Sequence, residues 1–130
     1  MYTPGNVHTD VTGGWSATTG NNYVQFGSES INFTNVDYFP IVSTNGTIPL
    51  SNYSTLSVDI KANSYGGSGN IYVGVANSRI TTDDQFTARV KKTTTGRETL
   101  SLDISTYDDS EYVVIAGYHS NANIYNVWLE

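Results

Sequence analysis

The chain has 130 residues, of which 38% are hydrophobic and 14% charged, and its formal net charge at pH 7 is −6. This length suits one domain, spanning residues 1–130, and is too short for two. The six Lys and Arg residues form no cluster, which argues against nucleic acid and an anionic membrane surface as partners, and the absence of cysteine excludes disulfides and thiolate metal sites.

The polar residues are mostly uncharged, because Ser, Thr and Asn make up roughly a third of the chain against a typical share nearer a fifth. Ten tyrosines argue against a disordered chain. No apolar run is long enough to span a bilayer, and the first residues lack the pattern of a signal peptide. We therefore expect either a protein that is not exported by that route or a domain excised with an added Met.

The first 22 residues are rich in Gly and Thr and predict an extended arm or open loop. Trp15 is the one large apolar side chain near its end. We expect Trp15 to close one end of the core, with an exposed aromatic platform as the alternative.

Short alternating segments follow. Residues 23–27 and 31–34 predict two strands joined by a tight reversal, and residues 38–43 predict a third. Pro40 favours an edge position for the third strand, because proline cannot donate to a sheet ladder. Asn45-Gly46 then predicts a type I′ turn.

The middle of the chain holds the clearest half-buried strand. Leu56, Val58, Ile60 and Ala62 are expected to face the core over residues 56–62. Residues 63–70 predict a flexible loop. Residues 71–76 predict the next strand, with Ile71, Val73 and Val75 facing the core and Tyr72 on the other face.

Residues 77–85 leave room for at most one helical turn. Two alternating strands follow, separated by a turn at residues 93–96. The inward residues expected from these strands are Phe86, Ala88 and Val90 in the first, and Leu100, Leu102 and Ile104 in the second.

Residues 110–130 predict a closing hairpin. Apolar runs at residues 112–118 and 124–130 flank His119-Ser120-Asn121-Ala122-Asn123, whose residue types are typical of turns. Val113, Ile115, Val127 and Leu129 are expected in the core. The hairpin would lie centrally in a sheet and complete the domain.

Strands recur about every ten residues, and no stretch has the spacing of a helix over three turns. The fold class predicted is all-β: an antiparallel β-sandwich, a jelly roll of about eight or nine strands. We expect two sheets packed face to face, with one face of each solvated.

Aromatic and amide side chains indicate a ligand-binding surface, because flat rings stack on the C–H faces of sugars while amides and charged groups bind hydroxyls. For any single tyrosine, a half-buried structural role remains the alternative. The tip of the predicted hairpin forms one edge of this surface. The candidate ligand-binding residues are Trp15, Tyr72, Asn77, Arg89, Tyr118, His119, Asn121, Tyr125 and Trp128.

Catalytic and metal sites are not predicted. Asp59 and Asp103 face outward as solubilising groups, with Lys61 as the expected partner of Asp59, and no serine-nucleophile motif occurs. Residues 108–111, with Glu130, are an oxygen-rich group that favours a solvated turn over a calcium site because its spacing is irregular. No cofactor is expected; a structural calcium ion is the alternative.

Four stretches resemble modules of structural proteins from phages and prophages of Gram-positive gut bacteria. They are residues 2–6, 10–15, 50–60 and 124–130, which read YTPGN, DVTGGW, LSNYSTLSVDI and IYNVWLE. Such modules look like galactose-binding-type jelly rolls, similar to carbohydrate-binding modules. The resemblance implies a place in the virion and a role in host-surface attachment or particle decoration, but it carries no specific ligand residue.

The predicted function is therefore a non-enzymatic binding module of a phage tail or fibre protein that recognises host-surface glycan. One alternative is a purely structural module that binds other virion proteins or copies of itself. Another is a carbohydrate-binding appendage of a secreted glycoside hydrolase, which would be extracellular.

Overall fold

The computed structural model describes residues 14–130, which form strands joined by turns and two short 3-10 helices. The helices are η1 (Asn21–Tyr23) and η2 (Leu50–Asn52). The strands are β1 (Trp15–Thr19), β2 (Val24–Phe26), β3 (Ile31–Phe33), β4 (Ile41–Thr44), β5 (Ile48–Pro49), β6 (Thr55–Ala76), β7 (Ala88–Lys92), β8 (Gly96–Asp103) and β9 (Ser110–Leu129).

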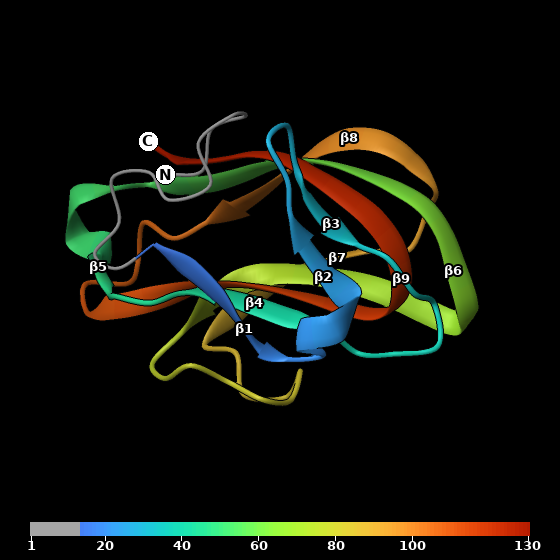
Figure 1. Cartoon of the computed structure of the whole chain (residues 1–130). Helices are drawn as coiled ribbons and strands as arrows, with labels where there is room; N and C mark the ends of the chain where they lie inside the picture. Colours follow the sequence, from blue (N-terminus) through green and yellow to red (C-terminus); the bar gives the residue numbers. More distant parts are fainter. Residues whose placement is uncertain (1–13) are drawn as a thin grey trace.

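Two long antiparallel strands, β6 and β9, organise the fold. They pair from Leu56 opposite Leu129 to Ala76 opposite Tyr112. Both bend near their middle, so each contributes its two halves to different layers, as Figure 1 shows at the right-hand end of the molecule.

Each layer therefore contains five strand segments. The order in the first is β2-β3-β9-β6-β8, with the C-terminal half of β9 and the N-terminal half of β6. The order in the second is β1-β4-β9-β6-β7, with the other halves. β5 adds a short pairing to the start of β9. The predicted all-β sandwich is confirmed.

The core lies between the two layers and is supplied by alternate residues of both. Leu56, Val58 and Ile60 of the first layer are fully buried, as are Ile71 and Val75 of the second. This alternation has the period of two that side chains follow along a strand. Of the predicted core residues, Val113, Ile115 and Val127 are also buried, while Leu129 is half-buried at the rim.

The outer face of the second layer is covered rather than solvated. Ile80, from the segment between β6 and β7, packs there with Ile41, Tyr72 and Val114. The Thr18 hydroxyl donates to the Ile80 carbonyl at 2.7 Å and secures this segment. Phe86 packs against this second cluster, so the prediction that it faces the main core is wrong; it precedes β7 and does not follow that strand's alternation.

The predicted closing hairpin is wrong. Residues 110–129 form the single strand β9, and residues 119–123 do not reverse the chain. The predicted loop at residues 63–70 is likewise part of the continuous strand β6. The long pairing between β6 and β9 gives the backbone N–H and C=O groups of both segments their hydrogen-bond partners. The chain therefore stays extended where the residue types alone were also compatible with a turn.

Three local predictions also change. β4 lies between β1 and β9 rather than at an edge, because Pro40 precedes the strand and uses its carbonyl to accept from the Gly117 N–H at 2.8 Å. Asn45 and Gly46 lack the positive φ of a type I′ turn, and β5 pairs with β9 instead of β4. Residues 1–13 of the predicted arm at residues 1–22 lie outside the described residues. The rest of the predicted arm contains β1 and the start of η1 and is not an open loop.

Candidate functional site: a pocket at the bend of two strands

The bend in β6 and β9 rests on unequal strand lengths. Tyr65 pairs with Ser120 and Asn70 pairs with Tyr118, so four residues of β6 face one residue of β9, His119. Gly67 has a φ of +56° within this bulge. A Cβ on Gly69 would lie 2.3 Å from the His119 carbonyl oxygen, so only glycine permits this approach.

His119 has a φ of +48° and is the one non-glycine residue with a positive φ in the described part of the chain. Its backbone N–H donates to the Tyr38 carbonyl at 3.0 Å, and its ring Nδ1 lies 2.8 Å from the Val36 carbonyl oxygen. Since a carbonyl only accepts, Nδ1 carries the proton, and Nε2 is the acceptor of the neutral ring. These two contacts hold an unusual backbone conformation in place, which is typical of functional sites.

A pocket of about 320 Å³ opens beside His119. We call it the bend pocket. Its lining residues are Val36, Asp37, Gly66, Gly67, Ser68, Tyr118 and His119. They supply a carboxylate, an imidazole, a hydroxyl, an aromatic ring and nearby backbone groups, with no Lys or Arg. Its volume lies at the lower end of the range typical of small-molecule sites.

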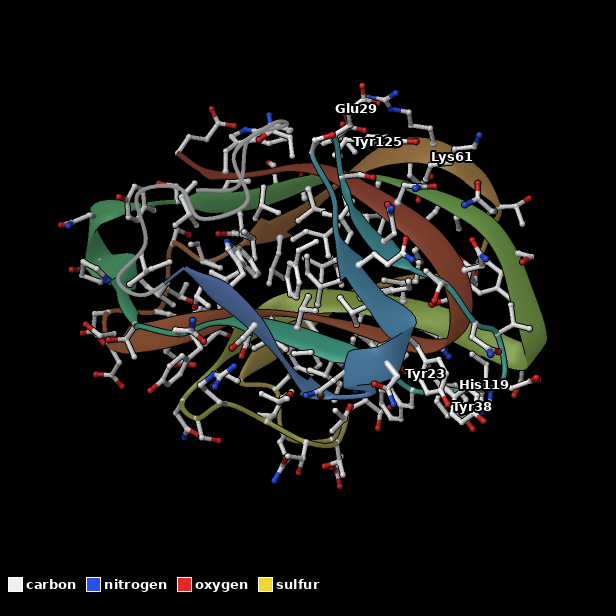
Figure 2. All side chains as sticks on the ribbon, in the orientation of Figure 1. Tyr23, Glu29, Tyr38, Lys61, His119 and Tyr125 are labelled. Carbon is white, nitrogen blue, oxygen red and sulfur yellow. The ribbon has the colours of Figure 1, made fainter. Side chains whose placement is uncertain are left out.

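Aromatic side chains surround this end of the sandwich. Tyr38 stacks on Tyr23 with ring centroids 3.7 Å apart and planes 10° from parallel, and 44% of Tyr38 is exposed. A hydrogen bond between their side chains raises the pKa of Tyr23 above its ordinary value. Figure 2 shows Tyr23, Tyr38 and His119 grouped at this end. Tyr118 packs edge-on against Phe39 at 5.1 Å, which fixes its ring in the pocket wall.

The structure brings two predicted site residues together here, Tyr118 and His119. Tyr38, Asp37 and the glycine bulge of β6 were not predicted as site residues. Two features could have indicated them: an Asn-Val-Asp turn followed by two aromatic residues, and a glycine-rich stretch inside an otherwise regular strand pattern.

Two other predicted aromatic platforms are each covered on one face by an arginine. The Arg89 guanidinium carbon lies 4.0 Å from the centroid of Tyr72, and Tyr72 is only 9% exposed. The Arg97 guanidinium carbon lies 4.0 Å from the centroid of Tyr125. Each of these cation–π contacts occupies one of the two ring faces on which a sugar could stack.

The remaining predicted residues lie elsewhere. Trp15 is 1% exposed in the main core, so its core role is confirmed and its use as an exposed platform is excluded. Asn77 is exposed just after β6, and about 23 Å of strand separates it from Asn70, the partner of the pocket residue Tyr118. Asn121 and Trp128 are half-buried; Asn121 hydrogen-bonds across the first layer to Asn63, and Trp128 pairs with Ser57.

The acidic residues have partners of their own. Arg97, not Lys61, binds Asp59, with two hydrogen bonds of 3.0 and 2.9 Å. The Ser105 hydroxyl and N–H donate to Asp103 and lower its carboxyl pKa. Within residues 14–130, no three His, Cys, Asp or Glu side chains are grouped so that they could hold a metal. In the predicted acidic turn, Asp108 and Asp109 are exposed but Glu111 is buried.

Comparison with known proteins finds no matching family model and no matching curated protein. Solved structures do match. A family 6 carbohydrate-binding module aligns with a TM-score of 0.55 and 13% identity, over 88% of this chain and 86% of that one. TmCBM27, a carbohydrate-binding module that recognises mannan, aligns with a TM-score of 0.50 and 15% identity over the same shares. The chain is a jelly-roll β-sandwich.

The same jelly roll matches part of a larger protein. The secreted serine protease VesC from Vibrio cholerae aligns with a TM-score of 0.53 and 13% identity over 78% of this chain. The match covers 21% of VesC, so this chain spans about a fifth of that protein. In the described part of this chain, no helix is both long and apolar enough to cross a membrane.

Proposed function

We propose that this jelly roll is a non-enzymatic glycan-binding module and that the bend pocket holds one sugar unit. The observation that carries the proposal is that one pocket combines an aromatic side chain in its wall with hydrogen-bond donors and hydrogen-bond acceptors. Tyr118 lines the pocket, and the exposed Tyr38 adjoins it through Asp37 and through its backbone bond to His119.

The chemistry of the bend pocket suits a neutral, hydroxyl-rich ligand. The Asp37 carboxylate accepts hydrogen bonds, as does Nε2 of His119 when the ring is uncharged, while the Ser68 hydroxyl can donate or accept. With no Lys or Arg in the lining and a net charge of −6, nothing there attracts an anionic group. The fold likeness to two carbohydrate-binding modules supports the same ligand class.

Binding is tested by NMR titration of the labelled protein with glucose, galactose, mannose and N-acetylglucosamine at millimolar concentrations. We expect one or more of these sugars to shift the amide signals of residues 36–38, 66–68 and 118–119. Tyr38→Ala should weaken binding about tenfold, the size of a lost aromatic contact. Asn52→Ala, at an exposed position of helix η2, serves as the control. Shifts that are absent with all four sugars, or that arise outside these segments, would overturn the proposal.

For its biological context, we propose a structural protein of a phage or prophage particle, attached to the host surface through this module. The sequence resemblance to phage modules supports this context. The likeness to a fifth of VesC favours the alternative, an appendage of a secreted enzyme. Gene neighbourhood separates the two: capsid, portal or tail genes support the virion, whereas a hydrolase domain on the same polypeptide contradicts it.

A further inference from the structure

A chain of asparagine side chains crosses the outer face of the first layer. Asn63 of β6 donates to the side-chain oxygens of Asn121 and Asn123 on β9, at 3.0 and 2.8 Å. Asn123 in turn donates to the side-chain oxygen of Asn32 on β3 at 2.7 Å. We call these four residues the amide row. Their mutual hydrogen bonds hold them in one arrangement before any ligand arrives.

The amide row has unused hydrogen-bonding capacity at both ends. The side-chain oxygen of Asn63 and the side-chain nitrogen of Asn32 have no hydrogen-bond partner within residues 14–130. Because neighbouring strands lie 4.7–4.9 Å apart, this acceptor and this donor are separated by roughly 10 Å, across two strand spacings. Asn63 is exposed, and Asn32 is half-buried.

The amide row is continuous with the bend pocket on three segments. Asn121 follows Ser120 and is two residues from His119 on β9, and Asn63 is three residues from Gly66 on β6. Asn121 also donates to the carbonyl of Thr34, two residues before Val36, at 3.4 Å. Two or three strand residues span about 7–10 Å, so the two surfaces adjoin.

We propose that the amide row is a second contact surface for the same ligand and that the protein binds an uncharged oligosaccharide chain rather than a single sugar. One unit occupies the bend pocket, and the following units lie across the amide row. The side-chain oxygen of Asn63 accepts hydrogen bonds from their hydroxyls, and the side-chain nitrogen of Asn32 donates to them. This inference rests on the proposed function, because the bend pocket must bind the first unit.

Preorganisation explains why amides suit this role. Binding then requires little ordering of side chains, because the row's mutual hydrogen bonds already fix its rotamers. Two new hydrogen bonds would raise the affinity for a chain about tenfold over that for one unit, which corresponds to about 1.4 kcal/mol for the pair. The competing explanation is that the amide row only stabilises the sheet. In that case, replacing its residues should not change the difference in affinity between long and short ligands.

The test is calorimetric titration with β-1,4-linked oligomers of mannose and of N-acetylglucosamine, each from one to six units. In the unchanged protein we expect at least one series to bind about tenfold more tightly at three units than at one. Asn63→Ala and, separately, Asn32→Ala should abolish most of this gain and leave the single-unit affinity as it was. Asn52→Ala should change neither, and thermal melting verifies that each variant is folded.

The outcomes separate the two proposals. Binding of single units with no gain for longer chains overturns the oligosaccharide inference and leaves the proposed function standing. A gain with length that survives both Asn variants overturns the role of the amide row. Equal weakening of single units and chains by the variants shows that the row is only structural. If no single unit and no oligomer binds, the proposed function itself fails.

Discussion

Arg97 lies over the ring of Tyr125 and at the same time binds Asp59 through both carboxylate oxygens. One guanidinium thus joins β8, β6 and β9 on the outer face of the first layer (Figure 2 labels Tyr125 there). The hydrogen bonds to Asp59 raise the pKa of Arg97 above its ordinary value. A planar group is needed to make both contacts, and a lysine ammonium is not planar.

We expect Arg97→Ala to lower the free energy of unfolding only slightly, because the contacts are largely exposed to solvent. Arg97→Lys should recover less than half of that loss. Urea denaturation measures both. Molar NaCl should shrink the effect of Arg97→Ala by screening the ion pair, whereas Arg89→Ala, which removes a ring contact from Tyr72, should respond less. A lysine as good as the arginine would contradict this account.

The glycine bulge opposite His119 permits a direct comparison of two substitutions. In Gly69→Ala, the new Cβ would meet the backbone carbonyls of His119 and Tyr118 at 2.3 and 2.9 Å. In Gly67→Ala, it would meet nothing within 4 Å, and the strain comes from the positive φ alone. We expect Gly67→Ala to cost about 1–2 kcal/mol and Gly69→Ala to cost more than about 3 kcal/mol. Thermal melting of the two variants measures the difference. Equal losses of stability would mean that the strands can move apart at the bend.

The C-terminal end of β9 should be indispensable. Val127 is fully buried opposite Val58, and the Glu130 carbonyl accepts from the N–H groups of Ser54 and Thr55 at 2.7 and 2.9 Å. Deleting residues 127–130 should unfold the domain, since single large-to-Ala core changes already cost about 3–5 kcal/mol. Circular dichroism on heating tests this, with Glu130→Gln as the control that keeps the backbone. Unchanged melting of the truncated protein would show that this end is peripheral.

Tyr65 should make stability depend on alkaline pH. Burial, with the nearby charge of Glu98, raises its pKa from 10.0 to about 12, and its hydroxyl donates to the Thr94 carbonyl at 2.9 Å. Since the folded-state pKa is the higher one, the stabilisation is complete below pH 10 and is lost as pH rises towards 12. Tyr65→Phe should lose about 1 kcal/mol at neutral pH.

Urea midpoints measured from pH 8 to pH 12 test this linkage. The unchanged protein should lose stability more steeply above pH 10 than Tyr65→Phe does, so the two curves should converge. Parallel curves would show that Tyr65 does not cause the alkaline loss. Tyrosinate absorbance provides a second readout, because one late-titrating group should disappear in the variant.

Local alternation allowed much of the sandwich to be predicted. Leu56, Val58 and Ile60 point to the core as expected, because side chains on a strand alternate whatever its partner is. The candidate site was predicted less well. Tyr118 and His119 do line one pocket, but Tyr125 and Tyr72 lie under arginines that are distant in the sequence, and no local pattern shows such a contact.

The sequence by itself determined the all-β class and the core faces of most strands, because these follow from composition and from a period of two residues. Only the tertiary structure decided that residues 110–129 form one bent strand and not a hairpin. Asn and Gly tolerate both a turn and a bulge, and the choice between them depends on backbone pairing with β6, more than 30 residues away in the sequence. That pairing sets Gly66 beside His119, and the contacts of His119 with the Val36 and Tyr38 carbonyls bring in the third side of the pocket.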